Sequence, residues 1–128
     1  MESTGRQALG VRVLMQGLML ALQEIAKEDD AIQEHLRGWN RIIQYTVMPD
    51  GPHVHVAFED GRVTPGVGEH GRANAVIRFA DLDTALAIFR NRLDPQTAFM
   101  QGKVQMTGDM ADAMKMALLA QMVSKYLR

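Results

Sequence analysis

Residues 93–118 carry the signals for a helix, a strand and a second helix within one short run. Asp94 predicts an N-cap and Pro95 predicts the first helical position, where the missing backbone N–H costs nothing. Gly102 predicts the end of that short helix, because glycine accepts the positive φ at which helices commonly close. The chain therefore changes between helix and strand within a few residues, which limits it to folds that mix both element types.

The second half of this run predicts a strand followed by a long apolar helix. Polar and apolar residues alternate over 103–107, which is typical of a half-buried strand. Gly108 predicts a turn, and Asp109 predicts the N-cap of a helix made mostly of Met, Ala and Leu. Upstream, alternation predicts another strand over 74–79, and an apolar stripe predicts a helix over 82–92.

These elements together resemble the conserved C-terminal block of the sterol-carrier-protein-2 (SCP-2) family of lipid carriers. The resemblance covers residues 73–118, and residues 7–72 are compatible with it in pattern. It implies a stand-alone, prokaryotic-type member with an α+β fold, in which helices cover a five-stranded, mainly antiparallel sheet. The family carries lipid in an apolar tunnel between these two layers and has no catalytic signature. The resemblance therefore implies a single SCP-2-like lipid-binding domain over residues 1–128.

The expected organisation follows the chain from its start. A flexible tail over 1–6 precedes N-terminal helices over 7–38, four strands over 41–79, and helices with the fifth strand over 81–128. The first helix, over 8–27, approaches the length of a membrane span, but Arg12 interrupts it and charge at mid-span is costly. We expect this helix to pack on the sheet, with an amphipathic surface that touches membranes as the alternative. No clean signal-peptide cleavage site follows it, so a cytoplasmic location is expected.

Two short patterns invite a different interpretation. Residues 66–71 match G-x-G-x-x-G, but a dinucleotide site needs a helix to follow and here a strand pattern follows. We interpret this segment as a flexible hairpin loop, and Pro65 confines the strand before it to a sheet edge or a bulge. His53 and His55 share one strand face, yet a metal would need a third converging ligand, so a solvated strand face is expected.

Nothing in the chain predicts catalysis. The serines, Ser3 and Ser124, lie near the two ends of the chain and neither sits in a nucleophile elbow. The paired carboxylates at 29–30 and at 81 and 83 lie at helix ends, where they complement the helix dipole. We therefore predict no enzyme, no catalytic residue, no metal and no cofactor.

Composition narrows the class of partner. The formal net charge is −1 with no basic block, which argues against nucleic acid. Cysteine is absent, which excludes disulfides and thiolate chemistry. The chain holds ten Met, five of them between Met100 and Met116. Methionine fills ordinary cores, but it also forms adaptable walls around flexible ligands. The clustering of these five residues favours the second interpretation.

The resemblance and the apolar pattern together nominate the residues that line a lipid cavity. These are Phe79, Leu86, Phe89, Phe99, Met100, Met106, Met110, Met114 and Leu118. The last helix repeats Met110, Met114, Leu118, Met122 and Tyr126 every four residues and is apolar almost all round near its middle. A helix of that kind is usually buried against two surfaces, here the sheet and either a lipid or another subunit, with plain core burial as the alternative.

The expected function is the non-catalytic binding and transfer of a long-chain lipid: fatty acid, fatty acyl-CoA, phospholipid, or a sterol or isoprenoid-like molecule. One alternative is an accessory module that presents a lipid-like intermediate, such as a quinone precursor, to a separate biosynthetic enzyme. Another is a structural or dimerisation domain without a ligand, with the apolar helices over 8–27 and 109–127 buried between subunits. Transient membrane contact and a homodimer stay open as partners.

Overall fold

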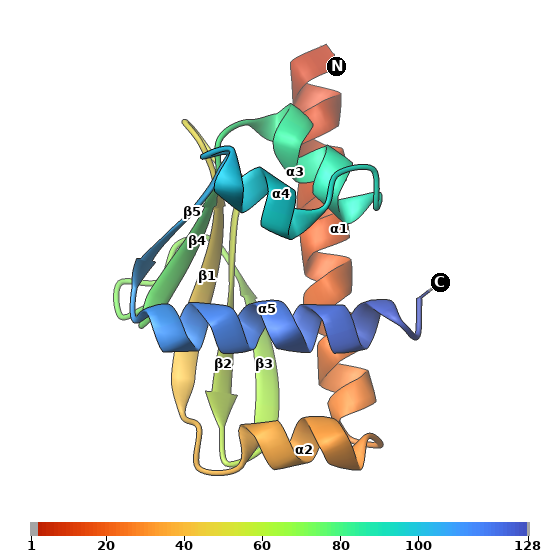
Figure 1. Cartoon of the computed structure of the whole chain (residues 1–128), viewed down its shortest axis with the longest axis vertical. Coiled ribbons are helices and arrows are strands. Elements are labelled where there is room, and N and C mark those ends of the chain that lie inside the picture. Colours follow the sequence, from red (N-terminus) through yellow and green to blue (C-terminus); the bar gives the residue numbers. More distant parts are fainter. Residues whose placement is uncertain (1–2, 128) are drawn as a thin grey trace.

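The computed structural model describes residues 3–127, in which helices cover one face of a five-stranded sheet (Figure 1). The helices are α1 (Ser3–Ala26), α2 (Asp30–Leu36), α3 (Leu82–Phe89), α4 (Pro95–Met100) and α5 (Met110–Ser124). The strands are β1 (Arg41–Val47), β2 (His53–Glu59), β3 (Arg62–Val67), β4 (Ala75–Phe79) and β5 (Val104–Gly108). The predicted α+β class is confirmed.

The strand order is β3-β2-β1-β4-β5. Three of the four pairings are antiparallel, and β1 pairs with β4 in parallel. The sheet is therefore mainly antiparallel, as predicted. Pro65 lies in β3, at one edge of the sheet, where the missing N–H breaks no pairing with a further strand.

The connection from β3 to β4 differs from the predicted hairpin loop. β3 lies at one edge and β4 lies beyond β2 and β1, so residues 68–74 must cross two strands before β4 can begin. The prediction of a hairpin was wrong because alternation over 74–79 reports a strand but not its partner. The Gly-rich segment serves a crossover, and no helix follows it in a parallel unit of the dinucleotide-binding kind.

Two helices form most of the covering layer. α1 packs on β2 and β3, and α5 crosses β1, β4 and β5 at a steep angle to α1 (Figure 1). The inward face of α1 belongs to the main core; its members are Val11, Met15, Met19, Leu22 and Ala26. These side chains meet the inward residues of the strands, which recur at every second position as the alternation predicts.

The start of α1 corrects the expected tail. The helix begins at Ser3, so residues 3–6 are helical, and only residues 1–2 of the expected tail lie outside the described part of the chain. The first turns are held by tertiary contact with α3, including a hydrogen bond from Gln7 to Asp83, which a local sequence pattern does not report. Among residues 3–127, the helix over Thr4–Ala26 is long and apolar enough to cross a membrane by length and composition.

The predicted punctuation of the C-terminal run is confirmed. Asp94 accepts a hydrogen bond from the Thr97 backbone N–H at 3.0 Å, and Asp109 accepts one from the Asp112 N–H at 3.0 Å. Gly108 has φ +86°, and a Cβ there would lie 2.4 Å from the Asn74 carbonyl oxygen. The turn between β5 and α5 therefore requires glycine, and that turn sets where α5 starts across the sheet.

Candidate functional site

Three aromatic rings meet between the sheet and α3. The ring centroids of Tyr45 on β1 and Phe79 on β4 lie 5.6 Å apart in an edge-to-face arrangement. Phe89, at the end of α3, lies 5.5 Å from Phe79 and 6.2 Å from Tyr45. Tyr45 and Phe79 are each 4% exposed, and Phe89 is half-buried. We call these three residues the aromatic cluster, and it brings the predicted residues Phe79 and Phe89 together.

The Tyr45 hydroxyl is the polar group of this cluster. It forms no hydrogen bond within residues 3–127. Because every fully buried side-chain polar atom of that part of the chain has a partner, the hydroxyl must be the tip through which Tyr45 keeps its small exposure. Burial raises the pKa of the Tyr45 hydroxyl well above its ordinary value, so the group is a neutral donor at physiological pH.

α3 is held above the cluster by its N-cap. The Asp81 carboxylate accepts a hydrogen bond from the Thr84 backbone N–H at 2.7 Å, and hydrogen bonds from Thr84 hold the pKa of Asp81 below its usual value. Leu86 and Phe89 lie on the inner stripe of this helix and are only partly buried against the core. Met106, which pairs with Ile77 across the sheet, is also partly buried. Four of the nine predicted lining residues thus border the space between sheet and helices.

The other five predicted residues lie at the surface. They are Phe99, Met100, Met110, Met114 and Leu118, which we call the outer apolar group. Met100 is 79% exposed and Met114 is 62% exposed. In α5 the buried face is a different one, formed by Asp112, Ala113, Met116, Leu119 and Val123. The four-residue repeat that starts at Met110 therefore follows the outward side of the helix for its first three members.

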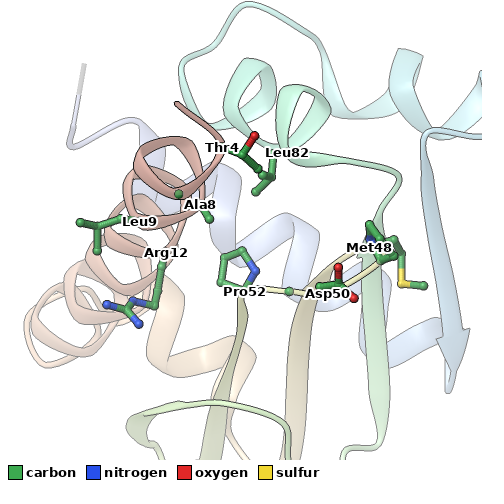
Figure 2. A pocket seen from close by; sticks show the side chains of 11 residues that line it. Thr4, Ala8, Leu9, Arg12, Met48, Asp50, Pro52 and Leu82 are labelled. Atoms are coloured by element: carbon green, nitrogen blue, oxygen red, sulfur yellow. The ribbon is translucent and has the colours of Figure 1, made fainter. Parts of the chain in front are cut away.

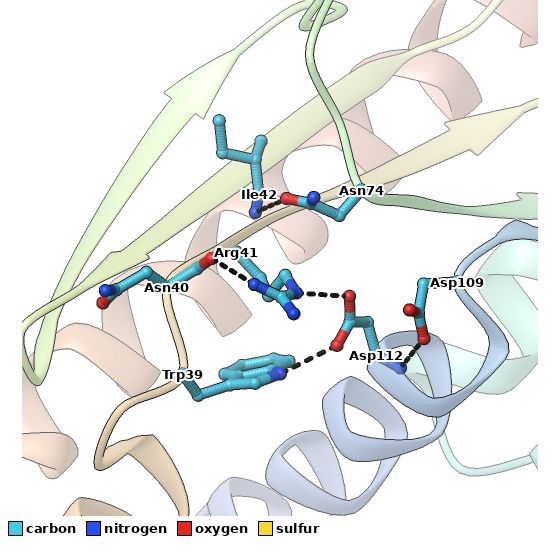
Figure 3. Close-up of polar contacts among 7 residues, drawn as sticks. All are labelled: Trp39, Asn40, Arg41, Ile42, Asn74, Asp109 and Asp112. Carbon is cyan, nitrogen blue, oxygen red and sulfur yellow. Dashed lines mark hydrogen bonds and ion pairs between the residues drawn. The ribbon is translucent and has the colours of Figure 1, made fainter.

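One buried carboxylate explains which face of α5 turns toward the sheet (Figure 3). Asp112 is 5% exposed and accepts hydrogen bonds from Trp39 Nε1 at 2.9 Å and from Arg41 Nε at 2.8 Å. Lys115 continues this side of α5, with its Nζ donating to the His35 carbonyl and lying 4.9 Å from the centre of the Trp39 ring. Trp39 packs on Phe58 as well, with ring centroids 4.8 Å apart. The partners of Asp112 and Lys115 are more than 70 residues away in the chain, so a local sequence pattern does not report them.

A pocket with a volume of about 490 Å³ opens beside the N-terminal turns of α1 (Figure 2). α1 lines one side with Leu9 and Arg12, the turn after β1 lines the other with Met48 and Asp50, and Leu82 at the start of α3 closes the gap between them. The walls are mostly apolar side chains with one cation and one carboxylate. Sequence analysis missed this pocket because it treated residues 1–6 as a tail.

The pocket and the aromatic cluster are neighbours. Met48 lines the pocket, and its backbone N–H donates to the Phe79 carbonyl at 2.9 Å. Met48 follows Tyr45 by three residues, which corresponds to roughly 10 Å along a strand. Leu82 lines the pocket while Leu86 and Phe89 continue the same side of α3 toward the cluster. One short helix thus borders both regions.

The opposite face of β1 is polar and closed. Gln44 Nε2 donates to Thr46 Oγ1 at 2.7 Å, and Thr46 Oγ1 lies 3.0 Å from His53 Nδ1. The crossover loop covers this face, with the His70 backbone N–H donating to Gln44 Oε1 at 2.8 Å. Gln44 and Thr46 are each 5% exposed although both are polar. We call this face the polar face.

The histidines of the polar face do not form a metal site. His55 Nδ1 lies 2.9 Å from the Gly68 carbonyl, and its ring contacts that of His70 edge to face. A Cβ on Gly66 would lie 2.1 Å from His55 Nε2, so a side chain there would displace this ring. Within residues 3–127 no group of three or more His, Cys, Asp or Glu side chains could hold a metal ion. The solvated strand face expected for His53 and His55 is instead half-buried beneath the loop.

A family model described as the SCP-2 sterol transfer family matches residues 22–121. The chain belongs to this family. The match contains the aromatic cluster, β1 to β5 and most of α5, whereas the residues that α1 contributes to the pocket lie before its start. The SCP-2 resemblance drawn from the sequence is confirmed, and so is the fold that it implied.

Two curated relatives carry the same name. Sterol carrier protein 2 of Oryctolagus cuniculus is 44% identical over 105 residues, which cover 76% of this chain and 18% of that protein. Sterol carrier protein 2 of Bos taurus is 33% identical over 105 residues, which cover 76% of this chain and 19% of that protein. The chain thus spans less than a fifth of the length of these relatives.

Solved structures share the SCP-2 fold along nearly their whole length. A crystal structure of sterol carrier protein 2 is 25% identical with a TM-score of 0.61, covering 88% of this chain and 94% of that one. The structure of the UbiJ-SCP2 ubiquinone synthesis protein is 13% identical with a TM-score of 0.62, covering 90% of this chain and 96% of that one. At that identity the second likeness shows the fold alone.

Proposed function

We propose that residues 3–127 act as one domain that binds a long-chain lipid without catalysis and transfers it. The observation that carries this proposal is the continuous apolar border formed by the pocket, α3 and the aromatic cluster. Membership in the SCP-2 sterol transfer family supports it. A volume of about 490 Å³ falls within the range of small-molecule sites, about 300–1,000 Å³.

In this proposal the lipid enters between α1 and the turn after β1 and lies beneath α3. Phe79, Leu86, Phe89 and Met106 then line the apolar part of the site. Partial burial of Leu86, Phe89 and Met106 supports this, because side chains at the border of a core can shift to admit a ligand. Leu82, Met48 and Leu9 add apolar contacts at the mouth.

The energetics favour reversible binding. A chain of about 16 carbons contributes roughly 0.8 kcal/mol per buried methylene, or about 12 kcal/mol before costs. Association and ordering oppose this with roughly 4–15 kcal/mol. The remainder corresponds to modest affinity, which suits a protein that collects a lipid and releases it.

The outer apolar group has a second role in this proposal. Its five side chains expose apolar surface on α4 and α5 without a covering element among residues 3–127. We assign them to transient contact with a membrane during loading and release, where apolar side chains enter the headgroup region. Presentation of a quinone-type intermediate to a separate enzyme is a narrower form of the same function, and the fold shared with the ubiquinone synthesis protein is compatible with it.

The test is native mass spectrometry of the freshly purified protein, with organic extraction of any bound molecule. We expect one acyl, isoprenoid or sterol-like lipid per chain, and uptake of added lipid by the emptied protein. A protein that arrives empty and takes up neither fatty acid, acyl-CoA nor sterol contradicts the proposal. A dimer that forms with concentration and never takes up lipid would instead favour a structural role for the apolar helices.

A further inference from the structure

Tyr45 occupies a central place in the candidate site. It lies in β1, the middle strand of the sheet, and its ring packs against Phe79 and Phe89. It is 4% exposed, so the aromatic ring itself is almost fully covered by apolar neighbours. A phenylalanine would satisfy every one of these packing contacts, because none of them uses the hydroxyl.

The hydroxyl has no role in holding the fold together. It makes no hydrogen bond within residues 3–127, whereas the neighbouring buried polar side chains do. Gln44 and Thr46, on either side of Tyr45 in the strand, bond to each other. Asp112 bonds to Trp39 and Arg41. The chain therefore leaves the Tyr45 donor to whatever occupies the space at its tip, which is water in an empty site and a ligand oxygen in a filled one.

We infer that the Tyr45 hydroxyl donates a hydrogen bond to a neutral oxygen of the bound lipid, so that the site prefers a long-chain lipid carrying a hydroxyl or carbonyl group over one carrying only an ionised headgroup. This inference rests on the proposed lipid-binding function. The hydroxyl is the part of Tyr45 that keeps a small exposure, while the ring packs on Phe79 and Phe89. A ligand oxygen there completes the pairing that the protein leaves open.

The surroundings of the Tyr45 hydroxyl favour a neutral ligand oxygen over an ionised one. The aromatic cluster itself supplies no cation, because its members are one neutral tyrosine and two phenylalanines. An ionised carboxylate placed there would lose its hydration without gaining a cation, which is far more costly than burying a neutral oxygen. Charged headgroups belong at the mouth of the pocket, which Arg12 lines.

The experiment compares three ligands that share one chain length: 1-hexadecanol, hexadecane and palmitate. Their affinities are measured by displacement of a bound anilinonaphthalene sulfonate dye from the full chain. Tyr45→Phe removes the hydroxyl and keeps the ring. Tyr126→Phe is the matched control, because Tyr126 is the second of the two tyrosines, is exposed, and bonds to Asp29 at the surface.

We expect Tyr45→Phe to weaken 1-hexadecanol about five- to tenfold, the loss typical of one neutral hydrogen bond, and to leave hexadecane within twofold. Tyr126→Phe should change neither ligand. The melting temperature of the ligand-free Tyr45→Phe protein should not fall, because the hydroxyl makes no hydrogen bond within residues 3–127. These readouts separate a ligand contact from a structural role, which would lower the melting temperature and weaken every ligand equally.

Two outcomes overturn the inference in distinguishable ways. If the unaltered protein binds all three ligands and Tyr45→Phe binds 1-hexadecanol with unchanged affinity, the assignment of Tyr45 is wrong while lipid binding stands. If the unaltered protein takes up none of the ligands, the proposed function fails and the inference fails with it.

Discussion

The two faces of β1 are buried to a similar depth but are completed in different ways. On the polar face, Gln44 and Thr46 bond to each other and to groups of β2 and the crossover loop. On the helix-covered face, Tyr45 lies among apolar rings, and its hydroxyl has no hydrogen-bond partner among residues 3–127. The comparison shows that a buried polar side chain indicates a candidate ligand site only where the protein itself provides no hydrogen-bond partner for it.

The covering elements explain this difference. A loop carries backbone donors and acceptors, so it can satisfy the amide, hydroxyl and imidazole groups beneath it. The backbone groups of a helix hydrogen-bond within the helix, so a helix contacts the sheet mainly through its side chains. In α3 these side chains are Leu86 and Phe89. The polar face is therefore closed by hydrogen bonds, whereas the other face is closed by contacts that an apolar ligand can replace.

The largest effect is expected from breaking the attachment of α5 on the helix-covered face. Asp112→Ala leaves the buried Trp39 N–H without its acceptor and removes the carboxylate from Arg41. We expect the free energy of unfolding to fall by about 2–4 kcal/mol, since hydrogen bonds to charged groups are the stronger ones and Arg41 stays partly hydrated. Urea unfolding measures this. Asp109→Ala, which removes only the N-cap, should lower the free energy of unfolding by about 1 kcal/mol. An equal loss in both variants would show that the bonds of Asp112 to Trp39 and Arg41 do not hold α5 in place.

The next prediction tests whether the apolar face binds the lipid. Phe89→Ala should weaken lipid affinity about tenfold or more, because burial of a phenylalanine side chain is worth roughly 1.5–3 kcal/mol. Phe99→Ala is the control, since Phe99 is exposed on α4 and should leave affinity within twofold. Dye displacement by one fatty acid compares the two. Equal losses would place the lipid outside the aromatic cluster.

The comparison also explains how far sequence patterns reach. Caps, turns and alternation are local, so Asp94, Gly102 and Asp109 could be interpreted correctly without a structure. The inward face of α5 depends on Asp112, whose partners Trp39 and Arg41 lie just before and at the start of β1. The sequence pattern of an apolar helix does not report these partners, so it could not show that Met110 and Met114 lie on the exposed side. The crossover of residues 68–74 likewise depends on strand order, which no local pattern encodes.

A smaller effect should separate the two faces at equal depth. Thr46→Val keeps the shape of the side chain but leaves Gln44 Nε2 without its acceptor and removes the hydroxyl from His53 Nδ1. We expect it to lower the free energy of unfolding by about 1–2 kcal/mol with lipid affinity unchanged. Tyr45→Phe should do the opposite, leaving stability intact while changing ligand preference. Thermal unfolding and dye displacement on both variants provide the check, and similar stability losses would erase the distinction between the faces.

The smallest effect on the folded protein is expected at the outer apolar group. Met114 is 62% exposed on α5, so Met114→Glu should change the free energy of unfolding by less than about 0.5 kcal/mol and leave lipid affinity unchanged. The sequence-based assignment of Met114 to the cavity would instead predict a loss of lipid binding. If the group contacts membranes, transfer of a fluorescent fatty acid between vesicles should slow severalfold in Met114→Glu, since a carboxylate resists entry into the headgroup region. Gln121→Glu, on the same exposed side of the helix, adds the same charge without removing an apolar side chain and should slow transfer less. Lost affinity in a folded Met114→Glu protein would return Met114 to the lipid site, which would require α5 to rotate or move away from the sheet when lipid binds.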